Sequence, residues 1–320
     1  MIGRSPGTIS EEIGRNSVRK KYERARAQTK ARLRRKQSKL QCMKVAMDPA
    51  LKKFVTEQIE NDQSPKAISG RLKKVETNMQ YASPKAIYAF VHSVHGRKIE
   101  KHLHSRATKK RDGAKRGVRK VSIDGRIMID QRPAHVENRE EFGHFEGDFI
   151  ESGKDGKGSL LVLVERKTRY PFLVYTEDKA TSHINALIAE TLLGIPVKSI
   201  TLDNDISFQK HSALSDLVGA VVFFCHPYHS WEKGTVENRN KSVRRYVVKG
   251  ANLSLISKER FAEIEEILRT RFMTCLGFKT PQEAWDIEME KARKSEVEEE
   301  NCATLAALPT SIIQPNRCSA

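Results

Sequence analysis

Five short apolar segments between residues 149 and 224 constrain the fold of this chain more than any other feature. They are 149–150, 160–164, 172–175, 199–202 and 221–224. Glycines at 153, 156 and 158 follow the first segment, and Thr168-Arg169 follows the second, which predicts a meander of three strands. Helical patterns near 181–194 and 209–218 precede the last two segments. This order predicts a mixed α/β sheet of five strands.

Three acidic residues lie in different settings around these segments. Asp148 begins the first strand, Asp203 ends the fourth, and Glu237 opens a basic helix. The first two are separated by 54 residues and the last two by 33, which is enough chain to bring two strand ends and one helix together. An isolated Asp at a strand end is more often a turn or helix-cap residue. Only the three acids together indicate a site.

The chemistry of divalent ions explains why carboxylates would be needed here. Mg²⁺ and Mn²⁺ prefer carboxylate oxygen and keep part of their water shell. Two such ions about 3.5–4 Å apart can hold both the attacking and the leaving oxygen of a displacement at phosphorus. Bound ions also reverse the negative charge of the acids, so that DNA can approach. The spacing of the acids therefore predicts a DNA-cutting site that holds Mg²⁺ or Mn²⁺, with two ions expected.

The helix around Glu237 has two distinct faces. At about 100° per residue, Glu237, Lys241 and Arg244 share one stripe. A second, apolar stripe is expected to pack on the sheet and holds Val236, Val243 and Val247. Lys241 and Arg244 would then face incoming phosphate, although a surface ion pair between Glu237 and Lys241 is the alternative. In the preceding loop, His229 and Lys233 are further candidate DNA contacts, and a capping or packing role for His229 is equally open.

The charge of the chain is unevenly distributed. It carries 58 Lys and Arg against 40 Asp and Glu, a net charge of +18. Residues 1–120 hold 32 of the basic and 10 of the acidic side chains, so this part carries +22 and the rest −4. A strongly basic region joined to a nearly neutral one is typical of a DNA-binding part attached to a separate catalytic body.

The N-terminal region is predicted to form small helical modules. Over residues 3–16 a capped helix is predicted, with Ser5 as the cap and Pro6 at its first position. Four side chains would face outward and could contact DNA, namely Arg4, Thr8, Ser10 and Arg15. A short amphipathic helix without a DNA role is the alternative. Residues 1–45 are expected to hold this helix followed by a basic arm, and the family resemblance described below implies that they form a partial helix-turn-helix inside which the sequence begins.

A second small helical module, like a helix-turn-helix, is expected over residues 46–98, where the sequence Ser-Pro-Lys-Ala-Ile opens two helices, at Ser64 and at Ser83. A three-helix packing module that contacts no bases is an equally weighted alternative. The next segment, 99–140, is predicted to be a basic linker. Residues 141–290 form the predicted catalytic core, and 291–320 an acidic, loose tail.

Membrane and secretory functions are not indicated. The chain has no run of 18 apolar residues and no apolar secretory segment near its start. Its five cysteines include no Cys-x-x-Cys pair. They are interpreted as reduced thiols of a cytoplasmic protein, and no zinc site is expected.

Several stretches of sequence resemble the IS-thirty family of bacterial insertion-sequence transposases. They are Arg132–Arg139, Gly143–Asp148, Val162–Tyr170, Cys225–Asn238 and Leu276–Pro281. The resemblance runs from about residue 2 to 285 and is strongest from Gly143 to Gly250. It implies a core like that of ribonuclease H and retroviral integrases, together with an N-terminal helix-turn-helix whose recognition helix would enter a major groove.

The resemblance also implies an activity. Asp148, Asp203 and Glu237 would be the metal-binding catalytic triad. The protein would bind the inverted-repeat ends of an insertion sequence, free a 3′-hydroxyl by water attack, and join that hydroxyl to target DNA. Two ends must be held together, so a homo-oligomer associated with the bacterial nucleoid is expected.

The chain departs from the family pattern at a few positions. Phe145 replaces a usual Trp, and Asp205 replaces a usual Gly that can adopt positive φ without strain. An acid expected near Ser207 is absent, and residues 271–275 replace an Asn-Arg-Pro segment. A decayed transposase that binds element ends and regulates intact copies is therefore the alternative function. A recombinase acting through Tyr246 is disfavoured, because the supporting groups are carboxylates.

Overall fold

The computed structural model describes residues 4–17, 21–38, 43–103, 125–154, 156–226 and 229–306. The chain divides into two compact units, Met1–Thr108 and Lys109–Ala320. Much of the predicted basic linker and the last part of the predicted tail lie outside the described residues. No helix within the described ranges is both long enough and apolar enough to cross a membrane.

The first unit begins with helices α1 (Pro6–Asn16) and α2 (Arg24–Ser38). The predicted cap of α1 is confirmed, because the Thr8 amide donates to the Ser5 hydroxyl over 3.3 Å. The four side chains proposed for DNA contact are all exposed, namely Arg4, Thr8, Ser10 and Arg15. Ile9 and Ile13 are exposed as well, by 37% and 45%. The described residues therefore give α1 no apolar core of its own.

The rest of the first unit is a small helical bundle. It contains α3 (Lys44–Met47), α4 (Pro49–Glu60), α5 (Pro65–Lys74), α6 (Pro84–Val91) and the 3₁₀ helix η1 (Arg97–His102). Ser64 and Ser83 cap α5 and α6 as predicted, each accepting from the backbone amide three residues on over 3.2 Å. One apolar cluster joins these helices, and Leu51, Ile68 and Phe90 are among its fully or almost fully buried members.

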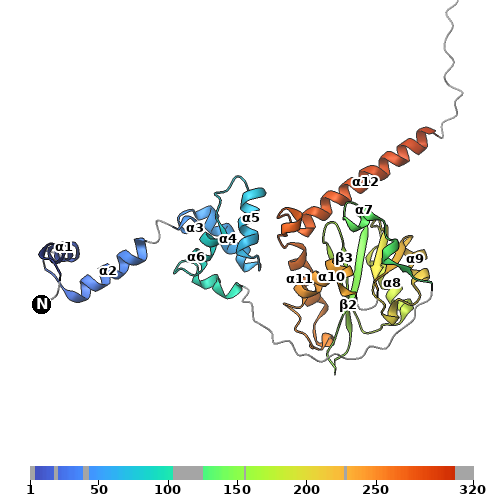
Figure 1. Ribbon diagram of the computed structural model, residues 1–320, viewed down its shortest axis with the longest axis horizontal. Helices are drawn as coiled ribbons and strands as arrows, with labels where there is room; N and C mark the ends of the chain where they lie inside the picture. The colour runs from blue at the N-terminus through green and yellow to red at the C-terminus, as the bar shows by residue number, and fades with distance from the viewer. Residues whose placement is uncertain are drawn as a thin grey trace, which may run out of the picture. The chain divides into compact units, whose positions relative to one another are not determined.

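The second unit contains one mixed sheet of six strands (Figure 1). The strands are β1 (Ile127–Met128), β2 (His144–Glu151), β3 (Ser159–Glu165), β4 (Pro171–Thr176), β5 (Ser199–Leu202) and β6 (Val221–Phe224). Their order is β1-β6-β5-β2-β3-β4. The meander β2-β3-β4 is antiparallel, whereas β5 pairs parallel with both β2 and β6.

The prediction of five strands is corrected by β1, which pairs parallel with β6. It lies inside the segment expected to be a basic linker. Only Ile127 and Met128 form it, and two residues are too few to produce a recognisable alternation of apolar and polar side chains. Sequence patterns therefore could not identify this edge strand.

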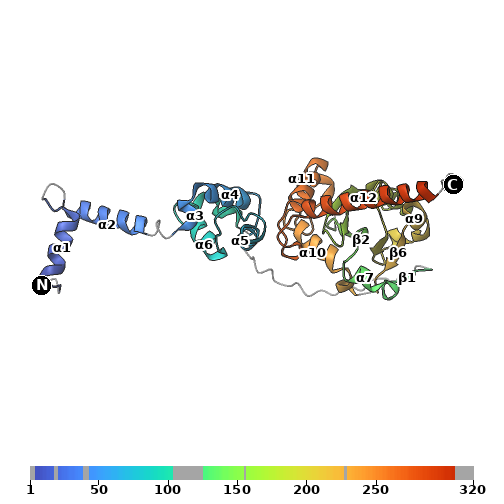
Figure 2. The same ribbon diagram turned by 90° about the horizontal axis from the view of Figure 1, so that it is seen from above.

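Helices cover both faces of the sheet. Leu161 and Leu163 of β3 face the cluster that includes α8 (Thr181–Thr191) and α9 (His211–Val218). The alternate residues of β3 face α10 (Gly234–Val243) and α11 (Lys258–Arg269), and they are Leu160, Val162 and Val164. Figures 1 and 2 show these helices as two layers with the sheet between them. Short helices occupy the connections, at Ile129–Gln131, Ala134–Glu137, Ile206–Phe208, Ser230–Lys233, Leu253–Leu255 and Thr274–Leu276.

The last helix, α12 (Pro281–Ala306), continues into the segment that was expected to be a loose tail from residue 291, and it includes the acidic stretch. Glutamate and lysine pairs one turn apart help to explain this, for example Glu290 with Lys294 over 2.6 Å. At its start, Trp285 stacks on Tyr170 with ring centroids 4.4 Å apart, which fixes α12 to the sheet.

The entry to β2 depends on a glycine. Gly143 has φ +99°, and a Cβ there would lie 2.3 Å from the carbonyl oxygen of Pro196. We expect Gly143→Ala to lower the free energy of unfolding by more than about 3 kcal/mol, because it adds a backbone clash to the cost of positive φ. Gly219→Ala is the matched control, since Gly219 also has positive φ but has open space at its Cβ. Urea unfolding followed by tryptophan fluorescence measures both variants, and equal losses would contradict this account of Gly143.

Candidate catalytic site

The structure brings the first two predicted acids together. Strands β2 and β5 run parallel with Glu146 opposite Thr201, so Asp148 and Asp203 lie opposite each other two residues further on. The Lys233 ammonium joins them, with Nζ 3.1 Å from Oδ1 of Asp148 and 3.5 Å from Oδ2 of Asp203. An ion that binds both carboxylates therefore has to displace this ammonium.

Lys233 was predicted to contact DNA. In the structure its side chain is only 6% exposed and lies against the two acids. Burial alone would lower the pKa of Lys233, but Asp203 and Asp148 outweigh it and the pKa lies above its ordinary value. For Asp203, burial raises the pKa, and Lys233 offsets this only in part. The lysine thus compensates the repulsion between the two aspartates.

One carboxylate oxygen is left for a further ligand. Within the part of the chain that the structure describes, Oδ1 of Asp203 is buried and has no hydrogen-bond partner. Such an atom loses its hydration without compensation, at a cost of about 1–3 kcal/mol or more for a charged group. A hard cation would supply the missing partner, and the oxygen donors present here are those that Mg²⁺ and Mn²⁺ prefer.

Helix α10 is anchored to the sheet by a buried carboxylate that sequence reasoning did not single out. Glu146 is fully buried and accepts from the amides of Thr235 and Val236, over 2.9 Å each. Its other oxygen accepts from Nε of Arg166, also over 2.9 Å. Amides of a first helical turn have no partner within the helix, and an acid at this end interacts favourably with the helix dipole.

A signal for Glu146 was present in the sequence. It stands two residues before Asp148 in a strand, so both side chains point to the same face of the sheet. A charged residue inside a strand needs partners when it is buried. The partners could not be identified from the sequence, because they come from a loop turn and a helix about 20 and 90 residues further along.

The third predicted acid is carried by the helix that contacts Asp148, but the possible ligand atoms of the three acids do not all lie within 4.8 Å of one another. Asn240 of α10 donates from Nδ2 to Oδ2 of Asp148 over 2.6 Å. Glu237 lies one turn before Asn240 on α10 and is half-buried. Two groups of three described side chains have possible ligand atoms all within 4.8 Å of one another, and Asp148, Asp203 and Glu237 are not one of these groups.

The two stripes predicted for α10 are found in the structure. The valine stripe is buried against the sheet, with Val236, Val243 and Val247 at most 1% exposed. Lys241 is exposed, and Arg244 donates from Nη2 to the carbonyl oxygen of Glu151 over 3.4 Å. Lys241 and Glu237 are both described, and no ion pair joins them. Tyr246 packs beside the valine cluster.

His229, the other loop residue predicted to contact DNA, belongs to a cluster with His226 and Glu232. Oε1 of Glu232 lies 2.9 Å from Nδ1 of His226 and 3.0 Å from Nδ1 of His229. Its second oxygen accepts from the backbone amide of His226 over 2.8 Å. Glu232 therefore holds this loop in shape, while the His229 side chain is 43% exposed.

Asp205 does not require the backbone conformation that was expected. Its φ is −70° and its ψ is 141°, which is extended backbone open to any residue, so the expectation of positive φ was wrong. Its carboxylate accepts from the amide of Ser207 over 2.8 Å and pairs with Lys179 over 3.1 Å. Most of its hydrogen-bonding capacity is therefore used away from Asp203, although its charge still contributes to the raised pKa of Asp203.

Comparisons with known proteins point to one group of relatives. The chain is 30% identical over 295 residues to the transposase InsI for insertion sequence element IS30A of Escherichia coli (strain K12), covering 88% of this chain and 76% of the relative. It is 33% identical over 291 residues to the transposase for insertion sequence element IS4351 of Bacteroides fragilis, covering 88% and 86%. A putative integrase of a Spiroplasma virus is 24% identical over 136 residues, which is 41% of this chain and 42% of that protein. No family model matches the sequence.

The position of Lys233 predicts that its removal lowers the stability of the ion-free protein and raises its affinity for ions. We expect Lys233→Met to destabilise the ion-free protein by about 1.5–3 kcal/mol, since it removes a charge-assisted contact to two acids. The same variant should bind Mn²⁺ several-fold more tightly, because no ammonium has to be displaced. Lys241→Met is the control, since Lys241 is exposed on the following helix. Thermal unfolding with and without Mn²⁺ measures both effects, and an unchanged response of Lys233→Met to Mn²⁺ would contradict the competition.

Proposed function

Because this chain belongs to the IS-thirty (IS30) family of insertion-sequence transposases, we propose that it binds the ends of an insertion sequence, cuts the DNA there and joins it to a target. The observation that carries the proposal is the pairing of Asp148 with Asp203 across β2 and β5, next to the helix that bears Glu237. These acids come from three distant parts of the sequence, and the core of the fold brings their elements to one place.

The proposed reaction is metal-dependent phosphoryl transfer of the kind that uses two aspartates and one glutamate. When bound, Mg²⁺ or Mn²⁺ would activate water and stabilise charge on the phosphate oxygens. Asp148 and Asp203 would hold an ion in common, and the unpartnered oxygen of Asp203 supports this role. Glu237 would complete the site from α10 and help to orient the attacking water. The freed 3′-hydroxyl would then attack target DNA without any covalent link to the protein.

Two features fix the positions of these acids. Glu146 fixes the start of α10 from inside the sheet, so the helix carrying Glu237 has a defined position relative to Asp148. Asn240 orients one oxygen of Asp148, and Lys233 contacts the other. The chain thus supplies a preorganised pair of aspartates rather than a flexible acidic surface, which is the condition for accurate placement of a phosphodiester.

The wider architecture supports a core like that of ribonuclease H over residues 141–290. An antiparallel meander is followed by two parallel strands with helices between them, which is the order that such a core requires. We further propose that residues 1–45 and 46–98 are DNA-binding modules, joined to the core by the basic segment 99–140. Residues 291–306 continue helix α12 from the core.

DNA contacts are proposed from both units. On α1 and just before it, the exposed polar side chains would meet a major groove, namely Arg4, Thr8, Ser10 and Arg15. On α10, Lys241 is exposed beside Glu237, and Arg244 lies on the same stripe. Cutting and joining two ends also requires that two copies of the chain act together, so we propose a homo-oligomer on DNA.

The catalytic proposal predicts that one substitution strongly reduces DNA cleavage and leaves DNA binding almost unchanged. We expect Glu237→Gln to reduce cleavage of end-containing DNA in Mn²⁺ by at least about 100-fold, since even residues that only support metal ligands contribute 10–100-fold. DNA affinity in a gel shift should change little. Glu190→Gln, on the exposed side of α8, is the matched control and should cleave normally.

Two outcomes would count against this assignment. Cleavage by Glu237→Gln at the rate of the unaltered chain would remove Glu237 from the site. Binding of element ends without cleavage by any of the three proteins would instead support a regulator that has lost its activity.

Lys241 provides a test of the phosphate contacts. We expect Lys241→Met to weaken binding to unrelated DNA sequences equally and to reduce the slope of log affinity against log salt by about 0.9, the value for one phosphate contact. Fluorescence anisotropy at several salt concentrations measures the slope. Lys291→Met, on α12, should leave it unchanged, and an unchanged slope in Lys241→Met would place Lys241 outside the interface.

A further inference from the structure

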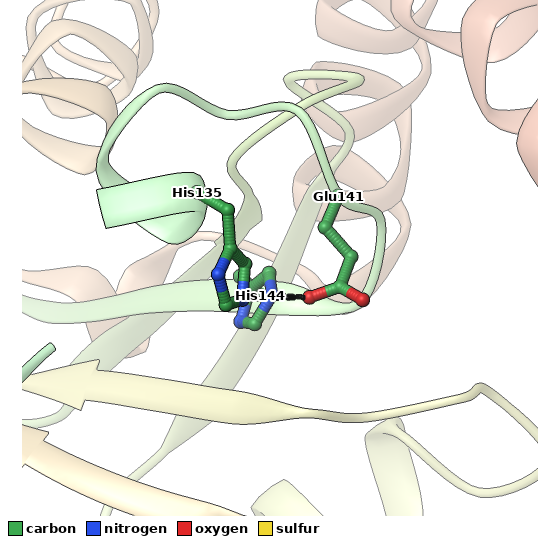
Figure 3. Close-up of side chains that lie close together, drawn as sticks. All are labelled: His135, Glu141 and His144. Atoms are coloured by element: carbon green, nitrogen blue, oxygen red, sulfur yellow. Dashed lines mark hydrogen bonds and ion pairs between the residues drawn. The ribbon is translucent and has the colours of Figure 1, made fainter. Parts of the chain in front are cut away.

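A cluster of two histidines and one glutamate lies at the start of β2, four residues before Asp148. His135 comes from the short helix α7 (Ala134–Glu137), Glu141 from the following loop, and His144 from the first position of β2 (Figure 3). Oε2 of Glu141 lies 2.8 Å from Nε2 of His144 and 3.2 Å from Nε2 of His135. Three possible ligand atoms therefore converge on one point, and all residues of the segment 134–144 are described.

Ser199 of β5 and the preceding Lys198 contact the other polar atoms of His144 and Glu141. Ser199 Oγ lies 2.8 Å from Nδ1 of His144, and Lys198 Nζ lies 2.6 Å from Oε1 of Glu141. Metal-binding histidines usually have their second ring nitrogen hydrogen-bonded in this way, which fixes the ring and selects the nitrogen that binds. A hydroxyl suits this position because it can donate to Nδ1 or accept from it. It therefore accommodates either tautomer of His144.

We propose that His135, Glu141 and His144 bind one divalent transition-metal ion of the zinc class. Two imidazoles and one carboxylate are a donor set typical of zinc and its neighbours, whereas Mg²⁺ selects oxygen ligands. The absence of Cys-x-x-Cys pairs, from which no zinc site was expected, does not bear on a site that contains no cysteine.

The distances fit such an ion. In a tetrahedral site with bonds of about 2.0–2.2 Å, neighbouring ligand atoms lie about 3.3 Å apart. The two contacts to Oε2 of Glu141 are 3.2 and 2.8 Å, and the ligand atoms of the two histidines lie within 4.8 Å of each other, so small side-chain movements bring all three to bonding distance of one ion. The ion would take the place of the two N–H protons that the carboxylate otherwise accepts. His135 is 52% exposed in its side chain, which leaves room for water as a fourth ligand.

This site is separate from the catalytic carboxylates. His144 and Asp148 are four residues apart on an extended strand, which corresponds to about 13 Å. Its effect would be structural, because the ion joins α7 and the loop after it to the first residue of β2. The turn at Gly143, where the chain enters the sheet, lies between two of the ligands. The inference does not depend on the proposed function.

The second cluster, His226 with His229 and Glu232, is less suited to binding a metal ion. Both oxygens of Glu232 already serve its own loop, one through the two ring nitrogens and the other through the backbone amide of His226. Residues 227 and 228 between the histidines also lie outside the described residues. This cluster is therefore the natural comparison in an experiment.

The test is a zinc titration of the intact, untagged chain after treatment with a chelator. Competition with a zinc indicator gives the number of tight sites and their affinity, and Co²⁺ absorption reports on tetrahedral geometry. We expect one site that His135→Ala weakens by at least about 100-fold and that His229→Ala leaves intact. Zinc should raise the unfolding temperature of the unaltered chain and of His229→Ala, but not that of His135→Ala. His135 is half-exposed, so its replacement leaves the fold intact.

Three results would overturn the inference. They are the absence of any site at micromolar zinc, a site that His135→Ala retains in full, and a site lost in His229→Ala alone. None of them involves DNA or cleavage, so they leave the proposed transposase activity untouched. Failure of the cleavage experiments would likewise leave the zinc result standing.

Discussion

The buried carboxylate of Glu146 is the interaction on which the arrangement of the site depends. It joins the centre of the sheet to the first turn of α10 through two amides, and it pairs with Arg166, which is itself 1% exposed. A buried ion pair contributes little net stability, because both charges lose their hydration. Here both charges also satisfy backbone groups, since Arg166 donates to the carbonyl oxygen of Val136 as well. The pair therefore specifies where a helix sits rather than simply adding stability.

The same strand face carries both the anchor and the proposed chemistry. Glu146 and Asp148 are alternate residues of β2, and the glycine between them faces Leu163 and Leu202 on the opposite side. Side chains on that opposite side close the core beneath the strand. A displacement of β2 would consequently move α10 and Asp148 together, which keeps Glu237 and the aspartates in a constant relation.

Local patterns predicted much of the fold and part of the site. The apolar segment that forms β3, the caps at Ser64 and Ser83 and the valine stripe of α10 depend on near neighbours in sequence, and the structure contains all of them. The pairing of Asp148 with Asp203 was reached through strand ends and family resemblance. The sequence could not reveal the burial of Lys233 between the acids or the docking of Glu146 on α10, because both depend on partners that are distant in sequence. The edge strand β1 was too short to show a pattern, and the extended backbone of Asp205 is set by its contacts with Ser207 and Lys179.

On the proposed mechanism, the ammonium of Lys233 implies an order of events. Two carboxylates and one lysine sum to a charge of −1, which repels a nucleic acid. One divalent ion in place of the ammonium would bring the sum of the two carboxylates and the ion to zero, and a second ion would make it +2, so the local field would attract phosphate only once both ions are bound. DNA held by more distant basic residues would then reach the carboxylates last.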